Sequence, residues 1–340
     1  MPPKIVAELD DALSTPPPGV VDTMNRLDGD LIVLGVGGKM GPTLARMARR
    51  ASDMAGVRRR VIGVSRFSSP ALPDDLRRNG IEPITCDLLD EDALERLPDA
   101  PNVVFMAGLK FGSSSRQALT WAMNCYLPGA VSRKYRHSRI VAFSTGNVYG
   151  LSPVSRGGSV ESDEPRPVGC YAHTCLGREM VFEHFSRALG IPMAMIRLNY
   201  AVELRYGVLV DIARQVWAQK PVSVRMGHFN AIWQAEANAM ALEAFDHAAS
   251  PPLLLNVTGQ ELLSVRQVAG EFGRLMGKPV HLEGEESRDA LISNARRACE
   301  LIGTPTVSSG QMIEWIAEWV MKGGELLDKP THFEVRDGNY

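Results

Sequence analysis

A phenol and a thiol stand one helical turn apart in the stretch GCYAHTCLGRE, residues 169–179. Because residues four apart share one face of a helix, Tyr171 and Cys175 point in the same direction. A phenol has an ordinary pKa of about 10, so it needs a neighbouring positive charge to act as a base near neutral pH. A thiol carries no such charge, and a thiolate at Cys175 would raise the pKa of the tyrosine. The source of a cation beside Tyr171 is therefore open.

A glycine-rich turn forms the second group of candidate residues. In DLIVLGVGGKMG, residues 30–41, the glycines Gly35, Gly38 and Gly41 follow an apolar stretch and open a predicted helix. Positions without side chains let the backbone approach a pyrophosphate, and the unpaired N–H groups of the helix start hold the anion. In this context the turn, which includes Lys39 and Met40, is predicted to bind a dinucleotide. A tight turn that binds nothing is the alternative.

The end of the second predicted strand bears on which dinucleotide binds. The sequence VSRFSS, residues 64–69, places Ser65 and Arg66 there and contains no carboxylate. A carboxylate would bind the ribose 2′-hydroxyl, whereas a guanidinium flanked by hydroxyls suits a 2′-phosphate. We therefore expect NADP in preference to NAD, unless Arg66 is only stacked or solvated. Asp87, next to Leu88 after the third strand, is expected to accept a hydrogen bond from the adenine amine.

Alternating apolar strands and helices predict the scaffold that positions these residues. Apolar strands separated by helices describe a parallel sheet covered on both faces, so we expect a Rossmann-type doubly wound α/β fold with a smaller C-terminal lobe. The expected strands lie within residues 30–41, 59–66, 81–90, 102–112, 138–150 and 192–200, with a further short strand near 252–259. We divide the chain into a leader (1–29), a dinucleotide-binding domain (30–200), a substrate-binding lobe (201–325) with room for strands that return to the sheet, and a tail (326–340).

Composition and charge exclude several classes of protein. The chain has 340 residues, 37 basic and 39 acidic, and a net charge of −2, so it lacks the basic excess that binding to nucleic acid requires. No apolar run approaches the length of a membrane span, and the N-terminus lacks the apolar core of a signal peptide. The five cysteines form no CxxC pair and suit a reducing cytosol. We expect a cytoplasmic protein that binds neither nucleic acid nor membrane, and we predict no metal site.

Taken in order, these motifs resemble those of the extended short-chain dehydrogenases/reductases, the NAD-dependent epimerase/dehydratase family. The resemblance covers roughly Leu31 to Trp319 and leaves the leader and the tail outside. The matching pieces are GVGGKMG, VVFMAG, Asn124 in the helix after the fourth strand, FSTGNVYG, PVGCYAHTCLGRE and RLNYAVELRYG.

The resemblance implies a role for each matching position. Tyr171 would be the acid/base that exchanges a proton with a substrate hydroxyl or carbonyl, while hydride moves to or from the nicotinamide. Ser144 or Thr145 would hydrogen-bond the same oxygen, and Asn124 would support the site. Asn199 would lie near the substrate or the nicotinamide. The implied cofactor-binding set is Gly35, Gly38, Lys39, Met40, Gly41, Ser65, Arg66, Asp87, Leu88, Ala107, Gly108, Cys175 and Asn199.

Cys175 is where the sequence departs from the family, which has a lysine there that lowers the pKa of the tyrosine and binds the nicotinamide ribose. Lys110 is the first candidate to replace that lysine, because it follows the fourth strand at the edge where ligands bind. An exposed surface lysine is the alternative. His173 would point away from Tyr171, and Arg178 lies two turns along, roughly 10 Å by helix rise. The oxidised nicotinamide ring is another source of charge. Covalent catalysis by Cys175 is disfavoured, because no obvious base accompanies it.

Two features of the C-terminal half bear on the substrate. Nucleotide-sugar enzymes of the family commonly carry an arginine–aspartate pair that meets the diphosphate, and Phe229 and Asn230 stand in its place. A short connection in residues 199–221 also argues against a bulky nucleotide diphosphate, unless Arg205, Arg214 or Arg225 compensates. His228 and Trp233, together with Lys110, Asn147 and Asn199, are the predicted substrate contacts, and a core tryptophan is the alternative for Trp233.

Two hypotheses of function follow. The first is an NAD(P)-dependent oxidoreductase, epimerase or dehydratase acting on a secondary alcohol or ketone of a sugar, sugar acid or related polyol. The second is a dinucleotide-binding protein without turnover, which would serve as a redox sensor or scaffold. As in related proteins, we expect a homodimer formed by the helices near 115–135 and 171–188.

Overall fold

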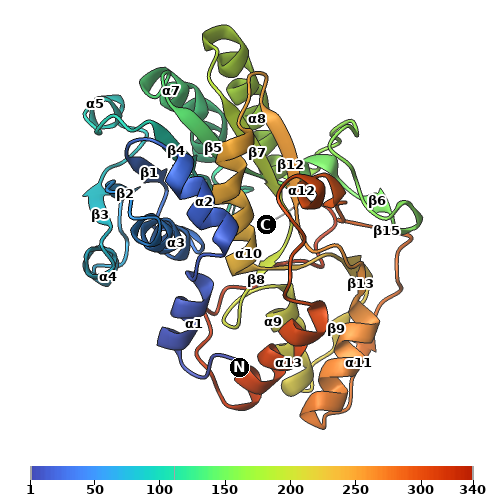
Figure 1. Cartoon of the computed structure of the whole chain (residues 1–340). Helices are drawn as coiled ribbons and strands as arrows, with labels where there is room; N and C mark the ends of the chain where they lie inside the picture. The colour runs from blue at the N-terminus through green and yellow to red at the C-terminus, as the bar shows by residue number, and fades with distance from the viewer. Residues whose placement is uncertain (1, 111, 339–340) are drawn as a thin grey trace.

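The computed structural model describes residues 2–110 and 112–338, and its centre is a seven-stranded parallel sheet (Figure 1). The strand order is β12-β7-β5-β4-β1-β2-β3. The strands are β1 (Leu31–Leu34), β2 (Val61–Ser65), β3 (Glu82–Thr85), β4 (Asn102–Phe105), β5 (Arg139–Thr145), β7 (Met193–Leu198) and β12 (Leu253–Val257). The chain runs outward from β1 to β3 and then returns to continue on the other side through β4, β5 and β7. This reversal between β1 and β4 is the point where such folds bind ligands.

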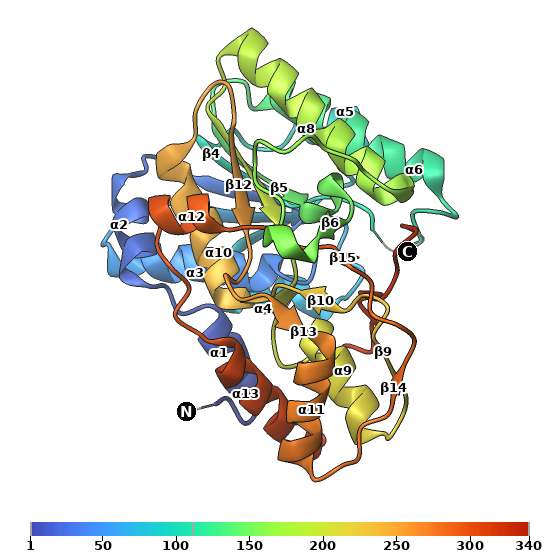
Figure 2. The same ribbon diagram turned by 90° about the vertical axis from the view of Figure 1, so that its right-hand side faces the viewer.

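Both faces of the sheet are covered by apolar packing. Leu31 and Val33 of β1 pack on one face with α2 (Pro18–Arg26), α3 (Gly41–Met54) and α10 (Gln234–Glu243). Ile32 and Leu34 point to the other face, which is covered by α7 (Leu127–Lys134) and α8 (Gly169–Leu189). Figure 2 shows the two layers on either side of the strands. Because successive side chains of a strand alternate, an uninterrupted apolar run is what a doubly covered strand requires.

A smaller lobe packs beyond the carboxyl edge of the sheet. Its principal helices are α9 (Val208–Trp217), α11 (Val265–Met276) and α13 (Ser309–Met321), which contact one another. Short strand pairs complete it: β8 (Ala201–Val202) with β11 (Ile232–Trp233), β9 (Val222–Ser223) with β14 (Leu282–Glu283), β10 (His228–Phe229) with β13 (Leu263–Ser264), and β6 (Ser152–Pro153) with β15 (Asp289–Ala290). The remaining helices are α1 (Val6–Leu13), α4 (Ala71–Arg78), α5 (Glu91–Glu95), α6 (Gln117–Trp121) and α12 (Arg296–Leu301), with single turns at Gly146–Tyr149, Val154–Arg156 and Ala244–His247.

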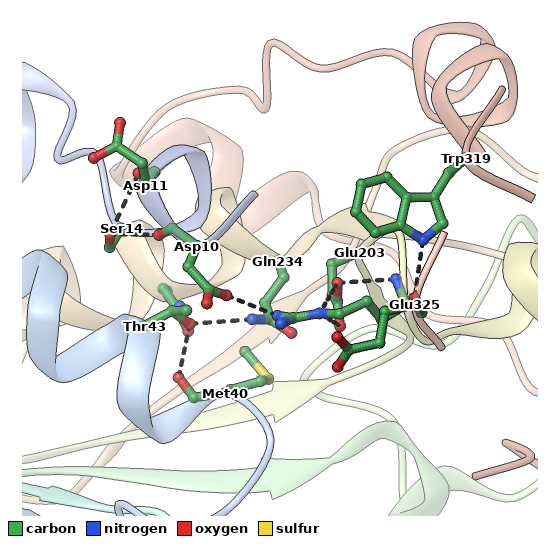
Figure 3. Close-up of polar contacts among 11 residues, drawn as sticks. Asp10, Asp11, Ser14, Met40, Thr43, Glu203, Gln234, Trp319 and Glu325 are labelled. Atoms are coloured by element: carbon green, nitrogen blue, oxygen red, sulfur yellow. Dashed lines mark hydrogen bonds and ion pairs between the residues drawn. The ribbon is translucent and has the colours of Figure 1, made fainter. Parts of the chain in front are cut away.

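The N-terminal leader is an integral part of the packing. Arg59, just before β2, donates to the main-chain oxygens of Met24 (2.5 Å) and Leu27 (2.6 Å) at the end of α2. Asp10 of α1 forms an ion pair of 2.9 Å with Arg205 in the loop before α9. Figure 3 shows Asp10 in this polar cluster beside Glu203, together with the Gln234 amide, which donates to the Thr43 hydroxyl at 3.1 Å. The leader therefore joins the sheet domain to the second lobe.

The C-terminal tail returns across the second lobe to the sheet domain. Trp319 Nε1 donates to the Glu325 main-chain oxygen at 2.9 Å (Figure 3), and Phe333 is buried against Phe229. At Gly338 the tail packs against the start of α8, where an added Cβ would lie 2.3 Å from the Val168 main-chain oxygen. Figure 2 shows this end of the chain near α6 and α8.

The fold agrees with the sequence-based prediction of a Rossmann-type sheet, with three refinements. The helix expected near 115–135 contains a π-helical turn at Ala122–Tyr126 between α6 and α7. Strand β3 is an exposed edge strand, in contrast to the other, apolar strands. The last strand of the sheet, β12, comes from residues 253–257, so the sheet extends beyond the range 30–200 that we assigned to the dinucleotide-binding domain.

Candidate active site

The glycine turn after β1 has no room for a side chain at Gly35 or Gly41. Gly35 has φ +93°, and a Cβ there would lie 2.6 Å from the main-chain nitrogen of Ala107. A Cβ on Gly41 would lie 2.3 Å from the Val36 main-chain oxygen, at the first residue of α3. The nearest atom to a Cβ built on Gly38 is a main-chain oxygen at 3.5 Å. The backbone thus forms an open cradle at a helix start, which fits the diphosphate of a dinucleotide.

One cavity at the carboxyl edge of the sheet collects many of the predicted residues. Its lining comes from the loops that follow β1, β4, β5 and β7, from α8 and from the second lobe. The predicted residues that line it are Gly35, Gly38, Lys39, Met40, Gly108, Lys110, Ser144, Thr145, Asn147, Tyr171 and Asn199. Those that we did not predict include Arg178, Tyr200, Tyr206 and Thr331. Parallel strands end at one edge, so residues that are distant in sequence meet there.

Tyr171 and Thr145 face each other in this cavity. The Tyr171 hydroxyl hydrogen-bonds with Thr145 and with Cys175. Burial raises the pKa of Tyr171 well above its usual value, and Cys175 raises it further, whereas Arg178 and Thr145 lower it. The Thr145 hydroxyl also accepts from the Asn147 side-chain amide at 2.8 Å. Of the two hydroxyls predicted beside the tyrosine, Thr145 is the one in contact with it.

Ser144 lines the same cavity, but its hydroxyl points into a buried polar network. It donates to Glu179 Oε1 of α8 at 2.5 Å. Glu179 pairs with Arg197 of β7 at 2.7 Å, and both side chains are almost wholly buried. Arg197 also donates to the Tyr149 hydroxyl at 2.7 Å. This network fixes α8, and with it Tyr171, against the ends of β5 and β7.

Asn124 does not line the cavity and instead clamps the loop after β4. From the π-helical turn, its amide accepts from the Leu109 main-chain nitrogen (3.0 Å) and donates to the Leu109 oxygen (3.1 Å). It also donates to the Thr174 hydroxyl at 2.9 Å and accepts from Arg178 at 2.7 Å. Its side chain is fully buried. The prediction that Asn124 supports the site is consistent with this position, which holds the segment leading to Lys110.

Cys175 is fully buried and does not line the cavity. It packs with Val148 and Tyr149, and burial raises the pKa of its thiol above the usual value. The expectation that this position contacts the cofactor is therefore corrected, because the thiol has no surface to offer.

Besides Lys39 of the glycine turn, two cations line the cavity, from different elements. Lys110 Nζ lies 5.8 Å from the centre of the Tyr171 ring, and burial lowers the pKa of this amine to about 8. Lys110 is thus not the exposed surface lysine that we considered as the alternative. The second cation is Arg178, whose guanidinium donates to Asn124 Oδ1 and to the Phe143 main-chain oxygen, each at 2.7 Å. The helix rise of roughly 10 Å between Tyr171 and Arg178 argued against Arg178 in the sequence analysis. That argument did not include the length of the arginine side chain, which extends back along the helix.

The residues predicted at the adenine end lie outside this cavity. Arg66 is 67% exposed and sits 3.8 Å from the Asp87 carboxylate. Ser65 Oγ lies close to the glycine turn, 2.4 Å from a Cβ built on Gly37. Leu88 and Ala107 are buried apolar residues. The edge beyond β2 and β3 therefore carries an exposed guanidinium and a carboxylate side by side.

His228 and Trp233 are not among the cavity residues. The Trp233 ring packs edge-on against Trp315, 5.5 Å between centres, and is buried. This corrects the predicted substrate role of Trp233, since it is a core tryptophan. His228 is half-buried in β10, paired with Ser264. Asn230, which stands where nucleotide-sugar enzymes carry a charged residue, is tied to the Glu261 oxygen at 3.0 Å and to the Ser293 nitrogen at 3.0 Å.

Residues 2–110 and 112–338 contain neither of two further classes of site, a metal centre or a membrane span. In these ranges no group of three or more histidine, cysteine, aspartate or glutamate side chains is arranged to hold a metal ion. No helix there is both long and apolar enough to cross a membrane.

Comparison with known proteins identifies the class to which this fold and site belong. The model of the NAD dependent epimerase/dehydratase family matches residues 31–202. The chain belongs to this family, as the motifs around the glycine turn and Tyr171 predicted, and it is an enzyme of that class. A comparison with curated proteins finds no matching sequence.

Solved structures share the fold at low sequence identity. UDP-glucuronic acid 4-epimerase from Bacillus cereus, in complex with NAD, superposes with a TM-score of 0.71 at 17% identity, over 86% of this chain and 99% of that one. A putative epimerase from Burkholderia cenocepacia gives 0.70 at 18% identity, over 88% and 100%. UDP-glucose 4-epimerase from Thermus thermophilus, also with NAD, gives 0.69 at 18%, over 86% and 99%.

Proposed function

We propose that the protein is an NAD(P)-dependent oxidoreductase, epimerase or dehydratase that acts at a secondary alcohol or ketone of a sugar, sugar acid or related polyol. The observation that carries this proposal is the meeting of Tyr171 and Thr145 in a cavity that begins at the open glycine turn. A nicotinamide dinucleotide, when bound, supplies the acceptor or donor of hydride. Its diphosphate would be held by the backbone of Gly35, Gly38 and Lys39.

The protein's own residues would handle the proton and position the substrate. Tyr171 takes the proton from a substrate hydroxyl during oxidation, or returns one to a carbonyl during reduction. Thr145 donates a hydrogen bond to the same region and is oriented by Asn147. Lys110, whose pKa is lowered to about 8, lies beside the tyrosine ring and brings a second titratable group to the cavity. Asn199 completes the wall after β7.

For the cofactor, we keep NADP as the preferred form and NAD as the alternative. The exposed Arg66 guanidinium supports NADP, whereas Asp87 at 3.8 Å and the NAD complexes of the structural neighbours support NAD. Substituting Arg66→Ala should weaken NADP binding at least tenfold relative to NAD, because one charge-assisted contact to a phosphate would be lost. Dissociation constants for both cofactors, measured by quenching of tryptophan fluorescence, test this preference.

For the substrate, the neighbours support a sugar, since their names refer to UDP-glucuronic acid and UDP-glucose. In this chain Phe229 is buried and Asn230 is neutral and engaged, which supports a substrate without a nucleotide diphosphate. The decisive test is a panel of sugars, sugar acids, polyols and UDP-sugars with each cofactor. Tyr171→Phe should abolish turnover and leave cofactor binding unchanged. Cofactor binding without turnover on the whole panel would contradict the enzyme and favour the sensor or scaffold.

The sensor alternative is favoured by one observation, the buried thiol beside a tyrosine whose pKa is raised well above its usual value. We also propose a homodimer, which is supported by the exposed side chains of Trp121, Tyr126 and Met180 on the helices expected to pair. Sedimentation of the wild type against Trp121→Lys tests it. The division into a dinucleotide-binding domain and a substrate-binding lobe is likewise a proposal.

A further inference from the structure

We propose that the Arg178 guanidinium supplies Tyr171 with the positive charge that a lysine at the position of Cys175 provides elsewhere in the family. This inference rests on the proposed function, since the charge matters for catalysis only if Tyr171 exchanges a proton. Arg178 acts through Tyr171 and is therefore a positioning residue. Three observations support it: the burial of an uncompensated charge, the place of that charge, and the room made for it.

The charge of Arg178 is not neutralised by a carboxylate. Among the residues that the structure describes, no acidic group lies within ion-pair distance of Arg178, although its side chain is buried, with 5% of the residue exposed. Its hydrogen-bond partners are neutral oxygens of Asn124 and Phe143, and its Nε has none. Arg197, the other buried arginine beside α8, is matched by Glu179 at 2.7 Å. A buried charge without a counter-ion is costly, so its retention points to a use in the folded protein.

The place of Arg178 directs this charge toward the tyrosine. Arg178 follows Cys175 by three residues on α8, so both share the face that carries Tyr171. It lines the same cavity as Tyr171. Its field lowers the pKa of both the Tyr171 phenol and the Cys175 thiol, against the effect of burial.

The loop after β4 leaves room for the guanidinium. A Cβ built on Gly108 would lie 2.4 Å from Arg178 Nη2 and 3.1 Å from Asn124 Oδ1. The absence of a side chain at Gly108 thus lets the arginine reach the Asn124 amide from two turns along the helix. A short thiol at Cys175, a long cation at Arg178 and a glycine opposite form a consistent set.

Lys110 cannot hold the same fixed charge. Its pKa is lowered to about 8, so the amine loses its proton in the weakly alkaline range, whereas an arginine side chain stays charged in proteins. The charged or titratable groups that act on Tyr171 are Cys175 and Arg178 from α8 and Lys110 from the loop after β4. Asp211 of α9 acts on Lys110 in turn.

The test is the ionisation of Tyr171 itself, measured without substrate or cofactor. Protein labelled with fluorotyrosine, whose phenol is more acidic, is titrated by fluorine NMR, and the Tyr171 signal is assigned by its loss in Tyr171→Phe. Arg178→Met should raise the midpoint by about one pH unit or more, the effect of removing a nearby opposite charge. Cys175→Lys added to Arg178→Met should bring the midpoint back down. Arg187→Met, which removes a cation from the exposed part of α8, should leave it unchanged.

Folding is controlled with Arg178→Gln, which loses the charge but keeps a donor for the same oxygens, and with near-ultraviolet circular dichroism of each variant. The inference is overturned if the Tyr171 midpoint is equal in the wild type and in the folded Arg178→Met and Arg178→Gln variants. It is also overturned if the Tyr171 phenol stays protonated over the whole titration in the wild type and in these variants. The sugar panel reports separately on the proposed function. If the Tyr171 midpoint shifts but no substrate turns over, the proposed function is contradicted and the coupling of Arg178 to Tyr171 stands. If a substrate turns over but the midpoint does not shift, the coupling is contradicted and the proposed function stands.

Discussion

The buried pair of Glu179 and Arg197, which ties α8 to the sheet, offers the most quantitative prediction. Arg197 meets the carboxylate through Nε at 3.1 Å and Nη2 at 2.7 Å, and Ser144 donates to the same group at 2.5 Å. The two charged side chains are 3% and 1% exposed. Replacing Glu179→Gln keeps the shape and removes the charge, so Arg197 becomes a buried cation without a counter-ion. Such a loss costs about 3–5 kcal/mol in the free energy of unfolding.

The assay is urea denaturation followed by tryptophan fluorescence, with a matched control on the same helix. Glu183 pairs with Arg187 at 2.9 Å, but these side chains are 37% and 59% exposed, so Glu183→Gln should cost less than about 1 kcal/mol. The double variant Glu179→Gln with Arg197→Met should recover much of the loss, because both charges are then gone. A cost for Glu179→Gln no larger than that for Glu183→Gln would refute the reasoning. It would mean that the Tyr149 hydroxyl, 2.7 Å away, is enough for Arg197.

Three further predictions follow from single contacts. Burial lowers the pKa of Lys110 from 10.5 to about 8, so between these values the unfolded chain holds the proton more tightly and the contribution of Lys110 to stability rises with pH. Lys39 has the same shift, whereas cysteines and tyrosines with raised pKa act in the opposite direction, so the quantity to measure is the difference between the wild type and Lys110→Met in urea titrations. The stability of the wild type relative to Lys110→Met should increase across this window, and a constant difference would contradict a buried amine. Thr331→Val removes the 2.6 Å hydrogen bond to the half-buried Asp211 carboxylate and should cost about 1–3 kcal/mol in the free energy of unfolding. It should also raise KM for a substrate from the panel, and an unchanged Kd of the cofactor would check that the change is local. Gly35→Ala should weaken cofactor binding at least tenfold and lower Tm, because a Cβ would lie 2.6 Å from the Ala107 main-chain nitrogen. Gly56→Ala is the control, since Gly56 also has a positive φ but faces open space; it should lower Tm only through about 1 kcal/mol of backbone strain.

The sheet and its ligand-binding edge could be predicted from the sequence because their signals are local. An apolar run such as LIVL, followed by glycines at 35, 38 and 41, fixes a strand, a turn and a helix start together. Once the strands are parallel, their carboxyl ends must meet, which places the glycine turn at the ligand-binding edge. The resemblance to the family added Thr145, Tyr171 and Asn199, and these residues line one cavity with Gly35. Helices α4 and α12 went unpredicted, since they are short and each buries a single side chain, Leu76 and Ala298 respectively.

The contacts that set charge and specificity could not be predicted, because they depend on how distant segments approach. Nothing near Arg178 in the sequence reveals that Gly108 lies opposite it; the only local signal was a glycine in the loop after β4. The predicted substrate contact of Trp233 was wrong for the same reason. The residue type does not reveal whether a tryptophan lines the cavity or packs in the core against Trp315. Thr331 belongs to the tail, which lies outside the resemblance to the family. It lines the cavity and donates its main-chain N–H to the Asp211 carboxylate.

The course of the tail has a practical consequence for producing the protein. Gly338 abuts Val168 and Gly169, two residues before Tyr171, so the first turn of α8 rests on a glycine that has no room for a side chain. In Gly338→Ala the new Cβ would lie 2.3 Å from the Val168 main-chain oxygen at a positive φ, so the backbone of one of the two segments would have to move. Preparations of the protein should therefore keep residue 338 and its surroundings intact, because Tyr171 takes its position partly from a segment that is distant in the sequence.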